Sequence, residues 1–265
     1  MQKAIFMLDS RMLAPQFGRR LALDGLAFFL LAVATIALLP GTTLAAQSLQ
    51  TPPLQPFHAE YDVVWKGITA GTSTLDLAPD PGNGWRYVSR NVAHGLFKLA
   101  LPGEILQTSV FSLDAGQPRP KRYAADDGTT DTSRDVELIF DWASGRVRGT
   151  SEGKSVDLPS RTALQDPMSV QIALMQALAA GERPQRFFLA DKDEIKEFVY
   201  DAEPATRLHT ALGDLDTLVY ASHRPGSDRV TRLWLAPSLG YTPVQAERRR
   251  GSKLEWSMRI RTLRR

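Results

Sequence analysis

Cysteine is absent from the 265-residue chain. Its absence excludes disulfide bonds, cysteine-ligated metal sites and thiol nucleophiles. It also excludes a lipid-modified cysteine at the start of an exported mature chain, so we do not expect a lipoprotein. A fold without disulfides depends on its hydrophobic core, and a chain of this length is long enough to bury one.

Histidine is scarce as well, and His58, His94, His209 and His223 include no pair at the spacing of a metal site. The sequence also lacks a Gly-rich phosphate-binding loop. From these absences we predict no catalytic residue, no metal ligand and no cofactor, and we expect that the chain is not an enzyme.

Charge of one sign is not in excess either. The chain carries 32 basic and 29 acidic residues, a formal net charge of +3. Residues 1–46 hold four of the basic and two of the acidic residues, which leaves 28 and 27 in the remainder. Nucleic-acid binding needs a dense basic face, so we expect no nucleic acid partner.

A long apolar run occurs near the N-terminus, at residues 25–39. Two arginines precede it, and a Pro-Gly break and small residues follow it. This order is typical of a secretory signal peptide at 1–46, cleaved after Ala45 or Ala46, and predicts a periplasmic protein that meets the membrane only through its leader. The run is short for a membrane-spanning helix, which needs about 20 residues; an uncleaved anchor is the alternative.

The mature region begins with a polar, proline-containing segment at 47–56, which predicts a linker before a single β-rich domain at 57–265. The domain opens on a predicted hairpin, 57–77. Tyr61 and its neighbours at every second position are apolar, which indicates a strand with one buried face. Gly67 and Gly71 bracket the point where the chain reverses or bulges.

Further short strands follow at spacings of about ten residues, with turn residues between them. The predicted strands are 85–93, 105–113, 134–142, 146–149, 155–158, 185–190, 194–200, 206–212, 216–222, 229–235, 244–249 and 254–262. A further short strand or a loop is expected around 118–128.

One helix is predicted, beginning at Asp166 as N-cap and ending at Gly181, with an apolar stripe that includes Ile172 and Met175. The fold class that follows is mainly β: a curved antiparallel sheet or incomplete β-barrel with one amphipathic helix packed on it. The apolar segment 95–103, flanked by glycines, is expected either to tuck against the core or to form an exposed lip.

Taken in order, several of these segments resemble the domain of unknown function 3108 family of Gram-negative envelope proteins. The resemblance implies an exported β-rich domain and no activity. The matching stretches are Tyr61–Ile68 with Gly71, Phe140-Asp141 with Gly145, Asp166–Ser169, Leu212–Leu215, and Leu233–Ala236 with Pro243-Val244.

Two groups of acidic residues are candidates for calcium binding or for paired catalytic carboxylates. The first contains Asp126, Asp127 and Asp131, and turn chemistry is the simpler explanation for it. The second contains Asp191, Asp193 and Glu194, and a solvated hairpin tip explains it.

Arginines cluster at 248–250 and at 259, 261, 264 and 265. Contact with anionic lipid headgroups is one interpretation. A charged, solvated edge strand is the other, and we favour it.

Aromatic residues are the candidate ligand-binding set, because a curved sheet of this size can enclose an apolar cavity. Core packing is the alternative for each of them. We therefore predict an envelope protein that binds lipid or another apolar ligand, or a protein partner; the alternative is an envelope-polymer hydrolase that uses carboxylates or a bound metal ion. The predicted cavity-lining residues are Tyr61, Trp65, Phe140, Trp142, Trp234 and Trp256.

Overall fold

The computed structural model describes residues 53–82 and 84–265. The predicted leader, its cleavage site and residues 47–52 of the predicted linker lie outside the described residues. Within the described part, alternating residues form fifteen strands of one sheet. The strands are β1 (Phe57–Trp65), β2 (Ile68–Asp80), β3 (Gly84–Ala93), β4 (Ile105–Asp114), β5 (Gln117–Asp126), β6 (Val136–Asp141), β7 (Arg146–Ser151), β8 (Lys154–Pro159), β9 (Leu164–Gln165), β10 (Arg186–Asp191), β11 (Glu194–Thr210), β12 (Gly213–His223), β13 (Arg229–Ala236), β14 (Thr242–Arg250) and β15 (Lys253–Arg264).

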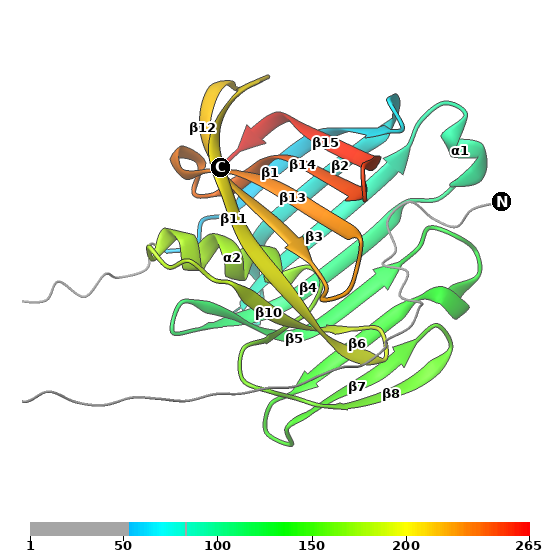
Figure 1. The fold of residues 1–265 in the computed structure, drawn as a ribbon. Coiled ribbons are helices and arrows are strands. Elements are labelled where there is room, and N and C mark those ends of the chain that lie inside the picture. Colours follow the sequence, from blue (N-terminus) through cyan, green and yellow to red (C-terminus); the bar gives the residue numbers. More distant parts are fainter. Residues whose placement is uncertain (1–52, 83) are drawn as a thin grey trace, which may run out of the picture. The chain divides into compact units, whose positions relative to one another are not determined.

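The strand order is linear, β8-β7-β6-β5-β4-β3-β2-β1-β15-β14-β13-β12-β11-β10-β9. The sheet is therefore open, with β8 and β9 at its edges, and it curves through space in Figure 1. Neighbouring strands are antiparallel apart from β9, which runs parallel to β10. The predicted fold class, a curved antiparallel sheet that does not close, is confirmed.

The predicted hairpin at 57–77 is confirmed as β1 and β2. Lys66 (φ 49°) and Gly67 (φ 84°) form its turn, and two successive positive φ angles suit a two-residue hairpin whose strands twist normally. The register shifts at Val63/Val64, opposite Gly71. A Cβ at Gly71 would lie 2.0 Å from the carbonyl oxygen of Val92, so the close approach of β3 requires glycine there.

The core lies on one face of the sheet, where every second residue points. Tyr61, Tyr87 and Phe111 come from β1, β3 and β4 and are fully buried. Ser73, Leu75 and Leu77 of β2 alternate in the same way and are buried.

Helix α2 (Ser169–Ala179) packs against β5. Nine of its eleven residues are buried, so it is covered on more than the single face that an apolar stripe predicts. The helix begins later than predicted, with Met168 and not Asp166 at the N-cap position. Asp166 still serves the first turn, because its Oδ1 accepts hydrogen bonds from the backbone N–H groups of Met168 and Ser169, both over 2.8 Å.

Three further features differ from the prediction. A second, four-residue helix, α1 (Phe97–Ala100), occurs in the segment between β3 and β4. The strands predicted at 194–200 and 206–212 are one strand, β11, because its pairing with β12 absorbs the interruption at Pro204 as a shift of register. The two-residue strand β9 has no prediction at all.

Because neighbouring strands are antiparallel, every second connection between strands lies at the same rim of the sheet. The β1–β2 turn, the β3–β4 connection that contains α1, and the β5–β6 connection lie there. The β10–β11 and β7–β8 turns also meet, since Lys192 Nζ lies 2.6 Å from Glu152 Oε1. Among the described helices, none is long and apolar enough to cross a membrane.

Candidate functional site

The six aromatic residues predicted to line a cavity lie in or against the hydrophobic core or beside the rim. The Tyr61 hydroxyl donates a hydrogen bond to the carbonyl oxygen of Pro243 over 2.8 Å, and Trp142 Nε1 donates to the carbonyl oxygen of Pro120 over 2.6 Å. The first contact crosses β15 to reach β14, and the second joins the end of β6 to the adjacent β5. A role in ligand binding stays a prediction for the six: Tyr61, Phe140 and Trp256 are buried, and Trp65, Trp142 and Trp234 are partly buried.

None of the six residues lines either of two hollows in the described part of the chain. The first is apolar, holds about 20 Å³, and lies behind α1 between residues such as Val63, Ala70 and Phe97. This volume is about that of one water molecule. The second is a more polar depression of about 300 Å³, lined by residues that include Arg183 and Tyr220.

The segment 95–103 forms an exposed lip, so the structure decides between the two arrangements that its sequence leaves open. Leu96 and Leu99 are 83% and 84% exposed, and Ile68 in the adjacent β1–β2 hairpin is 62% exposed. Leu96 and Leu99 are three residues apart across the single turn of α1, so they share a face. These three side chains, named the apolar lip below, are three of the five large hydrophobic side chains exposed in the described residues.

An aromatic contact fixes α1 to the hairpin. The rings of Trp65 and Phe97 meet edge to face, with centroids 5.5 Å apart. The Lys66 ammonium lies 4.2 Å from the centroid of Trp65, within cation–π range. The hairpin turn and α1 therefore form one surface in which apolar side chains alternate with Lys66 and Lys98.

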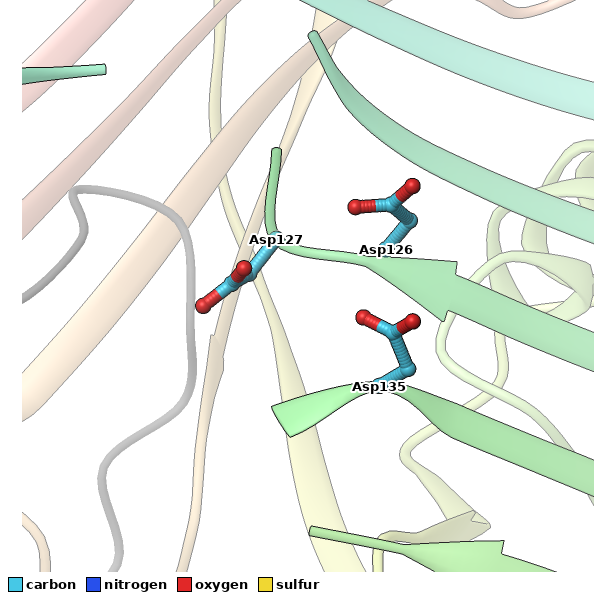
Figure 2. A group of neighbouring side chains, drawn as sticks. All are labelled: Asp126, Asp127 and Asp135. Carbon is cyan, nitrogen blue, oxygen red and sulfur yellow. The ribbon is translucent and has the colours of Figure 1, made fainter. Parts of the chain in front are cut away.

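A group of three carboxylates lies on the same rim: Asp126 and Asp127 at the end of β5, and Asp135 before β6. One oxygen from each lies within 4.8 Å of the others. Desolvation, followed by the charges of Asp126 and Asp127, raises the pKa of Asp135. Figure 2 shows the Asp127 carboxylate turned away from those of Asp126 and Asp135.

Asp127 is already engaged by its own loop. Its Oδ1 accepts hydrogen bonds from the Thr129 hydroxyl over 2.6 Å and from the Thr129 N–H over 3.0 Å. Its Oδ2 lies 3.6 Å from Arg134 Nη1. Asp131 likewise accepts from the Ser133 N–H over 3.1 Å. The contacts of Asp127 Oδ1 and of Asp131 are those of a turn. Asp127 Oδ2 and Asp135 Oδ1 are buried and have no hydrogen-bond partner among the described residues, so the geometry of the three carboxylates leaves a cation site possible.

The second acidic group is not simply a solvated hairpin tip. Asp191 is 5% exposed, and its Oδ2 lies 2.8 Å from the Nζ of the equally buried Lys196. Lys196 Nζ also lies 3.2 Å from Glu194. The spacing of acidic residues along the chain does not reveal this ion pair, because the strand pairing of β10 with β11 creates it.

The arginine clusters do not belong to an edge strand, so that part of the interpretation is wrong. β14 and β15 lie in the interior of the strand order, between β13 and β1. Arg248 stacks over Trp256 and donates from Nε to the Thr231 hydroxyl over 3.0 Å. Alternation along a strand shows which face is buried, but it carries no information about which strands are neighbours.

None of the four histidines belongs to a group of three or more side chains, among those described, that could hold a metal ion. His58 Nδ1 lies 2.5 Å from Asp76 Oδ1, and this hydrogen bond raises the pKa of His58.

The segment Gly149–Gly153 has the Gly-x-Ser-x-Gly spacing of many serine hydrolases. It lies in the β7–β8 hairpin, whereas the hydrolase motif requires a strand–turn–helix, and Ser151 is 3% exposed.

Comparison with known proteins agrees with this fold. No curated protein matches the sequence. A β-barrel-like protein of the domain of unknown function DUF1849 from Brucella abortus superposes with a TM-score of 0.53 at 12% identity, covering 79% of this chain and 97% of that one. MucB in the MucA/MucB complex of Pseudomonas aeruginosa gives a TM-score of 0.36 at 11% identity, over 79% of this chain and 51% of that one. The model of the family "Protein of unknown function (DUF3108)" matches residues 60–251, so the chain belongs to the DUF3108 family.

Proposed function

We propose that this chain is an exported, non-enzymatic binding module of the cell envelope that engages an apolar partner through the apolar lip. The leader-like pattern of residues 1–46 supports the location. The observation that carries the function is the exposure of Leu96 and Leu99, since folded proteins seldom expose neighbouring large apolar side chains without a use for them.

The packing of the sheet favours binding at the rim over carriage in the interior. Tyr61, Tyr87 and Phe111 fill the buried face of the sheet, and the apolar hollow behind α1 has room for about one water molecule. An acyl chain inside the sheet would have to displace these buried side chains. A partner at the lip requires no such rearrangement.

The test is site-specific photo-crosslinking in cells that export the full chain. A photoreactive residue replaces Leu99, and a matched control replaces Leu113, a 36% exposed leucine of β4 near the opposite rim. The proposal expects adducts, with protein or with lipid, from position 99 and few from position 113. Equal labelling at the two positions would contradict it.

A further inference from the structure

We infer that the partner of the apolar lip is the surface of an anionic phospholipid bilayer. This inference rests on the proposed function and adds the chemical identity of the partner. Nothing in the fold requires the protein to span the bilayer, because the contact uses only a hairpin turn and one turn of helix.

The shape of the lip suits a bilayer. Leu96 and Leu99 are more than four-fifths exposed, so they project from the rim and line no groove. A protein partner would have to supply a preformed pocket for each projecting side chain, whereas the boundary between headgroups and acyl chains accepts them in any arrangement. Trp65 is partly buried and packs on Phe97 of the same helix turn. Tryptophan is enriched at the level of the lipid headgroups in membrane proteins, which is where this ring would lie when the two leucines are inserted.

The two lysines beside the apolar lip indicate that the membrane surface it binds is negatively charged. Among the described residues, neither Lys66 nor Lys98 has a carboxylate within ion-pair distance. Glu104, at the end of the same connection, is paired with Arg90 over 2.6 Å. The two lysines are therefore uncompensated cations that flank apolar side chains, and an anionic headgroup layer complements both.

The neighbouring carboxylates set the tilt of the bound protein. The β3–β4 and β5–β6 connections touch, since a Cβ at Gly103 would lie 2.2 Å from the carbonyl oxygen of Gly128. In the strand order, β3 and β4 separate the β1–β2 turn from the β5–β6 connection that carries Asp131. Repulsion of these acidic residues from anionic headgroups tips the molecule so that Lys66 and Ile68 approach the surface first.

The experiment measures vesicle binding by the full chain, produced with its own leader and purified from the periplasmic fraction. Sedimentation compares phosphatidylcholine vesicles with vesicles that also contain phosphatidylglycerol, at low and at high salt. EDTA is present throughout, so that calcium held by the Asp126 group cannot bridge the protein to phosphates. We expect binding to the anionic vesicles, weakened by salt, and at least tenfold weaker binding to the zwitterionic ones.

Variants separate the apolar from the ionic part of the contact. Lys66→Ala and Lys98→Ala should each weaken binding about fivefold, the equivalent of about 1 kcal/mol per cation near an anionic surface. The pair Leu96→Ser and Leu99→Ser should reduce binding to background. Matched controls are Leu113→Ser and Lys121→Ala, two exposed positions away from the lip, which should bind as the unmodified chain does. All substituted side chains are exposed, and circular dichroism confirms that each variant folds.

A second measurement uses the absence of cysteine from the chain, which makes a single labelling site possible. An environment-sensitive dye on Leu99→Cys should shift to the blue with anionic vesicles, while the same dye on Leu113→Cys should not. No binding, equal binding to both vesicle types, or unaltered binding by the lip variants would each overturn the lipid assignment. Photo-crosslinks from position 99 to a protein alone would also overturn it, while leaving the proposed function intact.

Discussion

Ser109 Oγ donates a 2.6 Å hydrogen bond to Asp166 Oδ2, and this contact joins strand β4 to the start of α2 across 57 residues of sequence. Asp166 is fully buried, and its other oxygen accepts from two backbone N–H groups of the helix. One carboxylate thus joins the only long helix of the described chain to β4, an interior strand of the sheet.

Asp166→Ala should lower the free energy of unfolding by about 2–4 kcal/mol, because it leaves the two N–H groups and the Ser109 hydroxyl without an acceptor inside the core. Asp166→Asn keeps an acceptor oxygen in place and should cost less than about 1 kcal/mol at neutral pH. Urea denaturation measures both. Equal destabilisation by Ala and Asn would show that the capping oxygen is not what matters.

The stability of the protein should depend on pH through the same carboxylate. Burial raises the pKa of Asp166 from its ordinary 3.8 to about 6. Because the pKa is higher in the folded state, the contribution of Asp166 to the free energy of unfolding is fully present below pH 3.8 and is lost as the pH rises through 6. The loss amounts to roughly 3 kcal/mol, given about 1.4 kcal/mol per pKa unit. The free energy of unfolding of the unmodified chain should fall between pH 4 and 7, whereas that of Asp166→Asn should lack this fall, because the amide does not titrate. Parallel pH curves for the two proteins would contradict the assignment.

The buried pair Asp191–Lys196 should behave differently from exposed ion pairs. Asp191→Ala leaves the Lys196 ammonium in a site where it is 5% exposed, and should cost about 3–5 kcal/mol. The double variant Asp191→Leu with Lys196→Met removes both charges and should recover much of that loss. Lys192→Ala, which breaks the partly exposed contact with Glu152, is the control and should cost less than about 1 kcal/mol. A double variant no better than Asp191→Ala would contradict this account.

Asp135→Asn should stabilise the protein slightly at neutral pH. Its pKa is raised by burial and by Asp126 and Asp127, so the charged form is disfavoured in the folded state, and the amide removes that penalty. We expect a gain below about 1 kcal/mol by thermal denaturation.

Millimolar calcium should leave the Tm of the unmodified chain unchanged, because Thr129 and Arg134 already engage Asp127. A calcium-dependent rise in Tm that Asp135→Asn abolishes would instead establish a metal site.

Period-two alternation predicted most of the strands, and in β1 it predicted the buried face, as Tyr61 shows, because burial of one face is a local property of the pattern. Neighbour relations are not local. Nothing in the residues of β14 and β15 indicates that both lie inside the sheet, so their arginines suggested an edge. The gap predicted between the strands at 194–200 and 206–212 is likewise absent, because a register shift carries β11 past Pro204.

The candidate site was only half predictable for a related physical reason. Glycines around an apolar segment indicate a connection, yet they do not determine whether Leu96 and Leu99 turn inward. That choice depends on Phe97, whose ring packs against Trp65 from a different part of the chain. The role of Asp166 in capping the helix was visible in the sequence, whereas its complete burial beneath Ser109 required the fold.

The pairing of β1 with β15 bears on biogenesis. The first and last strands of the sheet meet near its centre, so this ladder cannot form until β15 has been synthesised. Contacts this distant in sequence slow folding, since a very large loop has to close first. The strands between β1 and β15 in the sequence can pair one after another as hairpins, but the sheet is complete only when β15 joins β1.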